Sequence, residues 1–272
     1  MTVTQSRIEI SRGSLSFFEA VPDGGEVRGT VLMVPGFTGS KEDFLPMAPY
    51  VTAAGYRLIA YSQLGQFDSD GPDDEGSEAE YTIAKFGADV LEVLDLAAPG
   101  ERVHLLGHSF GGLTTRNAVL RDPQRFRSYV ILDSPPNGAD AGAENLSALA
   151  DVVRTQGNEG LWNGMLAPLQ EMFPAPVKEF LHRRMLATKA HNLIGIAETM
   201  SAEPDLVAEL AATGVPALVV AGENDFVLVP VQQDVAARLG VKFEIIAGAG
   251  HTPNEEKPEE LTAVVAAFWD AH

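Results

Sequence analysis

The sequence predicts an α/β fold: a mostly parallel eight-stranded sheet flanked by helices, with a helical cap inserted after the sixth strand. Short apolar runs alternate with helical patterns along most of the 272 residues. These runs are continuously apolar, as is typical of strands buried on both faces of a parallel sheet. The alternation stops between Leu132 and Ala217. A gap of that length must hold structure of its own, which indicates an insertion.

Eight segments read as strands, and the first two are predicted to form an antiparallel pair. They are Arg7–Ile10, Leu15–Val21, Thr30–Val34, Tyr56–Tyr61, Arg102–Leu106, Tyr129–Leu132, Ala217–Ala221 and Lys242–Ile246. Helical patterns occupy the intervals between them. They are Lys41–Ala54, Ile83–Ala97, Phe110–Arg121, Val231–Leu239 and Glu255–Ala271.

Residues 136–203 carry helical patterns interrupted by prolines and no convincing strand. We interpret this segment as a helical cap, and residues 1–135 and 204–272 as the core domain. The cap is rich in large apolar side chains, some of which serve its own core. We expect Trp162, Met165 and Phe173 to line an apolar acyl pocket, because binding sites are mostly apolar with a few polar groups.

The composition excludes several classes of function. With 38 acidic and 19 basic residues the net charge is −19, which disfavours nucleic acids and anionic membranes as partners. The chain has no cysteine, so disulfides, zinc–thiolate sites and cysteine nucleophiles are excluded. We find neither a signal-peptide pattern nor an apolar stretch of membrane-spanning length, and we expect a cytoplasmic protein that acts on a small molecule.

The segment Gly107-His108-Ser109-Phe110-Gly111 has the pattern G-x-S-x-G. It follows a predicted strand and precedes a predicted helix, which is the setting of a nucleophile elbow. The glycines let strand and helix pass closely while Ser109 projects its hydroxyl near a helix N-terminus. The sequence therefore predicts Ser109 as a nucleophile.

A serine hydroxyl needs a base, and the base needs an acid to orient it. His251 follows the last predicted strand in a glycine-containing loop, so it can reach the carboxyl edge of the sheet. Asp225 follows the preceding strand and is the leading acid, with Glu223 and Asp133 as alternatives. The chain order Ser109, Asp225, His251 is that of an α/β-hydrolase triad.

Two backbone N–H groups are expected to stabilise the oxyanion. One belongs to Phe110, directly after the nucleophile, and the other to Phe37, in the Pro35-Gly36-Phe37-Thr38-Gly39 turn. We predict no cofactor and no metal, since no cluster such as H-E-x-x-H occurs in the sequence.

Together, residues 107–112, 35–39, 222–225 and 250–251 resemble the α/β-hydrolase superfamily, over essentially the whole chain from about Thr30 onward. Members of that superfamily often insert helices after the sixth strand. The chain departs at two places from patterns that many members share, and both departures concern the subfamily. Pro35-Gly36 stands where members often have His-Gly in the oxyanion turn. Residues 62–69 stand where many members carry D-x-R-G-x-G-x-S after the fourth strand.

The resemblance and the predicted triad imply a cofactor-free serine hydrolase that cleaves a carboxyl ester or thioester of a small lipophilic or aromatic substrate through an acyl-enzyme. Three alternatives remain. A perhydrolase of the haloperoxidase type, and a carbon–carbon bond hydrolase or lyase, would use the same triad. A non-catalytic binding protein would keep only the pocket.

Overall fold

The computed structural model describes residues 1–166, 174–225 and 228–272. In this part of the chain, eight strands form one sheet in the order β1-β2-β4-β3-β5-β6-β7-β8. They are β1 (Thr2–Ile10), β2 (Gly13–Val21), β3 (Gly29–Val34), β4 (Tyr56–Tyr61), β5 (Val103–His108), β6 (Phe126–Leu132), β7 (Ala217–Gly222) and β8 (Lys242–Ile246). β2 pairs antiparallel with β1 and β4, and the other neighbouring strands are parallel. The predicted fold class is confirmed.

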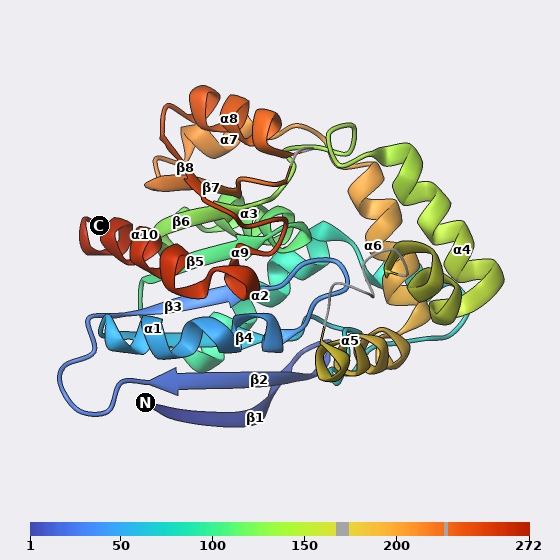
Figure 1. Cartoon of the computed structure of the whole chain (residues 1–272), viewed down its shortest axis with the longest axis horizontal. Helices are drawn as coiled ribbons and strands as arrows, with labels where there is room; N and C mark the ends of the chain where they lie inside the picture. The colour runs from blue at the N-terminus through green and yellow to red at the C-terminus, as the bar shows by residue number, and fades with distance from the viewer. Residues whose placement is uncertain (167–173, 226–227) are drawn as a thin grey trace.

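Helices cover both faces of the sheet (Figure 1). One apolar cluster joins the sheet to α1 (Ala48–Ala53) and α10 (Pro258–Asp270). A second cluster joins the other face to α2 (Ile83–Ala97), α3 (Phe110–Arg121), α7 (Val207–Ala212) and α8 (Leu228–Leu239). Among the described residues, no helix has both the length and the apolar content needed to cross a membrane.

Three long helices lie between β6 and β7 in the sequence: α4 (Ala143–Leu161), α5 (Ala175–Ala187) and α6 (Ala190–Ser201). A short π-helical segment, η4 (Trp162–Leu166), follows α4. α4 packs against both α6 and α5, and Figure 1 shows the three helices grouped at the right-hand end of the sheet. They occupy the place predicted for a cap, while the treatment of residues 136–203 as a separate domain stays a prediction.

Several boundaries differ from the predicted ones. β1 begins at Thr2 because pairing with β2 sustains it although its side chains are mostly exposed, so apolar content did not mark its start. α8 begins at Leu228, earlier than the predicted Val231.

Prolines divide two predicted helices. The segment predicted as one helix over Lys41–Ala54 is a 3₁₀ helix, η1 (Lys41–Met47), followed by α1, and Pro46 lies inside η1. The last predicted helix divides into α9 (Pro253–Glu256) and α10. Lys257 between them has φ −140° and ψ 54°, because the ring of a following proline disfavours the helical conformation. Two further 3₁₀ turns are η2 (Ser77–Glu80) and η3 (Pro123–Arg125).

Candidate active site

Ser109 occupies the turn between β5 and α3. Its φ of 52° and ψ of −121° lie in a sparsely populated region, at a cost on the order of 1–3 kcal/mol. Two glycines permit the tight turn. A Cβ at Gly107 would lie 2.5 Å from the Gly111 carbonyl oxygen, and one at Gly111 would lie 2.7 Å from that of Pro35. The strained backbone places the Ser109 side chain at the N-terminus of α3.

Ser109, His251 and Asp225 come together from three separate loops. His251 Nε2 lies 3.1 Å from Ser109 Oγ, and His251 Nδ1 lies 2.5 Å from Asp225 Oδ2. His251 is 47% exposed, whereas Asp225 is buried. The structure thus brings the three residues of the predicted triad into one hydrogen-bonded chain.

The Asp225 carboxylate decides the tautomer of His251. A carboxylate only accepts hydrogen bonds, so Nδ1 carries the hydrogen and donates it to Asp225. In the neutral ring, Nε2 then has a free lone pair directed at the Ser109 hydroxyl. The N–H of Leu228 donates to the other Asp225 oxygen over 3.2 Å, which helps to fix this carboxylate.

The two alternative acids have other partners. The carboxyl group of Asp133 is fully buried and accepts the N–H of Gly222, at 3.1 and 3.2 Å from its two oxygens. Burial, reinforced by the charge of Asp225, raises the pKa of Asp133 to about 8. Glu223 accepts the N–H of Gly248 over 2.8 Å. Asp225 is therefore the acid that the structure places on His251 Nδ1.

Asp133, Asp225 and His251 also form a group with the residue types of a metal site. One ligand atom from each lies within 4.8 Å of the others. A metal on His251 Nδ1 would displace the hydrogen that Asp225 accepts, and the raised pKa of Asp133 keeps that carboxyl neutral at pH 7. The arrangement therefore fits a carboxylate that orients an imidazole base better than a metal centre.

The two predicted oxyanion residues lie close to Ser109. Phe110 begins α3, and Phe37 lines the cavity next to the nucleophile. A Cβ at Gly36 would lie 3.2 Å from Ser109 Cβ, so the Phe37 turn packs directly on the elbow. In the described part of the chain, the N–H groups of Phe37 and Phe110 donate to no other residue. Both N–H groups are therefore available to a ligand.

A cavity of about 420 Å³ opens onto Ser109 and His251. Its apolar lining includes Phe37 and Pro135 from the core, Leu146 of α4, Met200 of α6 and Leu228 of α8. A pocket of this size with a mostly apolar wall suits a small organic molecule. The helices between β6 and β7 thus supply part of the cavity wall.

The predicted pocket residues differ from this lining. Trp162 is buried, and its ring centre lies 4.8 Å from that of His182 on α5, so it fills the space between the helices of the cap. It is not among the described residues that line the cavity, a correction of the prediction. The side chain of Met165, and Phe173 as a whole, lie outside the described residues.

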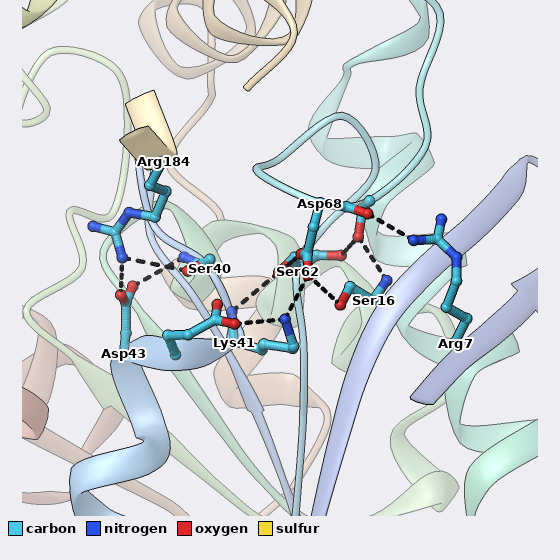
Figure 2. A network of polar contacts seen from close by, with 10 residues as sticks. Arg7, Ser16, Ser40, Lys41, Asp43, Ser62, Asp68 and Arg184 are labelled. Carbon is cyan, nitrogen blue, oxygen red and sulfur yellow. Dashed lines mark hydrogen bonds and ion pairs between the residues drawn. The ribbon is translucent and has the colours of Figure 1, made fainter. Parts of the chain in front are cut away.

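One wall of the cavity is polar. Arg184 of α5 donates to the Asp43 carboxylate and, over 3.4 Å, to Ser40 Oγ. Both members of this ion pair are buried, and both line the cavity. Figure 2 shows the pair at one end of a polar network in which buried Lys41 contacts Asp68 over 2.8 Å. The network joins the cap to the loops of the core and neutralises the charge of Arg184 within the wall.

Two residues that sequence reasoning did not connect with His251 hold its loop. His108 Nε2 lies 2.8 Å from the His251 carbonyl oxygen. The Glu256 carboxylate accepts the N–H groups of Gly250 and Thr252 over 2.8 and 3.0 Å. Thr252 precedes α9, and the capping-box spacing pairs such a residue with a carboxylate three positions later, which is Glu255. The local sequence therefore indicated neither Glu256, four positions after Thr252, nor the partner of His108.

Comparisons with known proteins extend this picture. The sequence model of the alpha/beta hydrolase family matches residues 31–264. A 2-hydroxy-6-oxononadienedioate/2-hydroxy-6-oxononatrienedioate hydrolase of Paraburkholderia xenovorans (strain LB400) is 28% identical over 266 residues, covering 90% of this chain and 88% of that protein. The 3-oxoadipate enol-lactonase 1 of Acinetobacter baylyi (strain ATCC 33305 / BD413 / ADP1) is 27% identical over 235 residues, with 78% of each chain covered.

Solved structures share the fold. That of the enol-lactonase from Burkholderia xenovorans LB400 superposes with a TM-score of 0.83 at 21% identity, covering 97% of this chain and all of the other. Since the family model spans most of the chain and the relatives are named hydrolases or lactonases, this protein is an enzyme and belongs to the alpha/beta hydrolase family.

Proposed function

We propose that this enzyme is a cofactor-free serine hydrolase that cleaves a carboxyl ester or thioester of a small lipophilic or aromatic substrate through an acyl-enzyme. The hydrogen-bonded chain Ser109–His251–Asp225 at the wall of the cavity carries this proposal. A serine beside an oriented, unprotonated imidazole nitrogen is the arrangement that activates a hydroxyl for attack.

In the first half-reaction, Ser109 Oγ attacks the acyl carbon while its proton passes to His251 Nε2. The N–H groups of Phe37 and Phe110 hold the resulting oxyanion, and each such donor lowers the barrier by about 3–4 kcal/mol. Asp225 stabilises the imidazolium that forms. The intermediate then collapses, and the departing alcohol or thiol takes the proton from His251 Nε2.

In the second half-reaction, water replaces the departed group. His251 Nε2 removes a proton from the water as its oxygen attacks the acyl carbon of the acyl-enzyme. The second tetrahedral intermediate uses the same two N–H donors. When it collapses, Ser109 Oγ leaves and recovers its proton from His251, so the carboxylic acid is released and the enzyme returns to its starting state.

The cavity lining supports a lipophilic, uncharged acyl group. Leu146, Met200 and Leu228 offer apolar contacts. Among the described residues of the lining, Arg184 is the one with a lysine or arginine side chain, and Asp43 already neutralises its charge. Asp140 adds a further carboxyl group to the lining, so a strongly anionic substrate would meet repulsion there.

A second candidate is hydrolysis of a carbon–carbon bond on the same triad. The observation in its favour is the similarity to the 2-hydroxy-6-oxononadienedioate/2-hydroxy-6-oxononatrienedioate hydrolase, over nine-tenths of this chain. The substrate of that relative is, by its name, a dicarboxylate, for which the neutralised Arg184 is poorly suited. We therefore favour the ester or thioester.

The test is a substrate panel combined with a covalent probe. Wild-type enzyme is assayed with p-nitrophenyl esters of graded acyl length, a thioester, an enol lactone, a 2-hydroxy-6-oxodienoate and, for perhydrolysis, an ester with peroxide. A fluorophosphonate should label Ser109, and Ser109→Ala should abolish labelling and lower kcat on the order of 10⁴–10⁶-fold. Ester turnover by Ser109→Ala at near wild-type rate would show that the nucleophile lies elsewhere.

A further inference from the structure

His108, next to the nucleophile, makes two contacts with the proposed base. Its Nε2 lies 2.8 Å from the carbonyl oxygen of His251, and the two ring centres are 5.1 Å apart. The side chain is 4% exposed, and His108 is the last residue of β5, in the middle of the sheet. His108 therefore links the strand that ends at the elbow to the loop that carries His251.

The contact determines the tautomer of His108. A carbonyl oxygen only accepts, so Nε2 of His108 must carry the hydrogen and donate it. Burial, with the neighbouring His251 adding to it, lowers the pKa of His108 to about 3. His108 therefore stays neutral at working pH, with Nδ1 unprotonated. Nδ1 is buried without a hydrogen-bond partner, 3.2 Å from where a Cβ on Gly36 would lie.

His108 and Glu256 hold different backbone groups of the loop that carries His251. The Glu256 carboxylate holds the N–H groups of Gly250 and Thr252, on either side of His251. In the described part of the chain, His108 is the side chain that donates to the carbonyl of His251 itself. Without this donor, the bond from the Thr252 N–H to Glu256 would be left to hold one side of the peptide unit after His251, so this unit could tilt and the imidazole could shift relative to Ser109 Oγ.

We propose that His108 is a positioning residue that holds the backbone of His251, and with it the imidazole, in line with Ser109. The inference rests on the proposed function of the triad, since it assigns no chemistry to His108 itself. A displacement of about 1 Å in a reacting group can cost about a hundredfold in rate. Loss of the contact should therefore lower kcat rather than raise KM.

Replacing His108 by glutamine or by asparagine distinguishes the effect of the hydrogen bond from the effect of the space that the ring fills. The side-chain nitrogen of glutamine reaches about as far as Nε2 of histidine, whereas that of asparagine reaches only about as far as Nδ1. We expect His108→Asn and His108→Leu to lower kcat about tenfold to a hundredfold with KM nearly unchanged, and His108→Gln to restore most of the loss. His104→Asn is the matched control, because His104 is equally buried on β5 but bonds to Ser128 over 2.8 Å.

The proposal would be overturned if His108→Asn or His108→Leu kept the kcat of the wild type at a pH where the enzyme is fully active. It would also be overturned if the kcat of His108→Gln were no higher than that of His108→Leu. NMR of the wild-type imidazoles provides a test that needs no turnover and no variant. His108 should show the Nε2–H tautomer and should not titrate between about pH 5 and 8. An Nδ1–H tautomer would overturn the positioning contact even in an active enzyme, whereas an inactive wild type with the expected NMR signals would refute only the proposed function.

Discussion

Two aspartates near His251 illustrate how single residues acquire different roles. Asp225 accepts the Nδ1–H of His251 over 2.5 Å, whereas Asp133 accepts a backbone N–H from Gly222. Both are buried, and the like charge of Asp225 adds to the effect of burial on the Asp133 pKa. One carboxyl group is thus suited to stabilise an imidazolium, and the other to remain protonated beside it.

The asparagine variants of these aspartates should separate the two roles. Asp225→Asn presents an amide to Nδ1 and can favour the wrong tautomer of His251, so kcat should fall by about 10⁴-fold. Asp133→Asn keeps an oxygen for the Gly222 N–H and should retain most of the activity. Ester turnover and circular dichroism of both purified variants measure this. The opposite ranking in folded proteins would transfer the role of the acid to Asp133.

At the scale of elements, the helices between β6 and β7 form part of the cavity wall. Leu146 of α4 and Met200 of α6 face the cavity, while Arg184 of α5 ties the same group of helices to Asp43. Removing one partner of such a buried pair leaves an uncompensated charge, which is more harmful than losing an exposed ion pair. An ion pair therefore links the cap to the core, while apolar side chains of the cap line the cavity.

Met200→Ala should change acyl selectivity without removing the chemistry. Shortening this side chain enlarges the cavity, so the kcat/KM ratio of long to short acyl esters should rise by about tenfold to a hundredfold. Labelling of Ser109 by a fluorophosphonate should persist. Trp162→Ala is the matched control, because this equally buried side chain packs against His182. It should reduce stability by about 3–5 kcal/mol and leave the acyl ranking unchanged. Equal rankings in wild type and Met200→Ala would contradict this assignment.

For the whole molecule, the buried Asp133 links stability to pH. The pKa of Asp133 rises from 3.8 to about 8 on folding, so between these values the folded protein keeps a proton that the unfolded chain releases. Stability therefore falls as the pH rises through this window. The net charge of −19 acts in the same direction, because carboxylates that ionise repel one another.

Asp133→Asn isolates the contribution of the one group. The stability of the variant relative to wild type should grow as the pH is raised from about 4 to about 8, by up to about 1.4 kcal/mol per pH unit. Urea unfolding of both proteins at several pH values measures the difference. A difference that stays constant with pH would mean that Asp133 ionises alike in the folded and unfolded protein.

The sequence by itself determined the features that depend on neighbouring residues. Continuous apolar runs predicted the strands, and the glycines around Ser109 predicted the strained elbow, where the structure gives Ser109 a φ of 52°. The order of Ser109, Asp225 and His251 along the chain indicated the triad. Only the tertiary structure decided which acid meets His251, because Asp133 and Asp225 both follow strands at the same edge of the sheet. The tertiary structure likewise decided three features that join residues far apart in sequence: the cavity wall, the Arg184–Asp43 pair and the contact of His108 with His251. Hydrophobic periodicity and local propensity do not predict such contacts, because they depend on neighbouring residues alone.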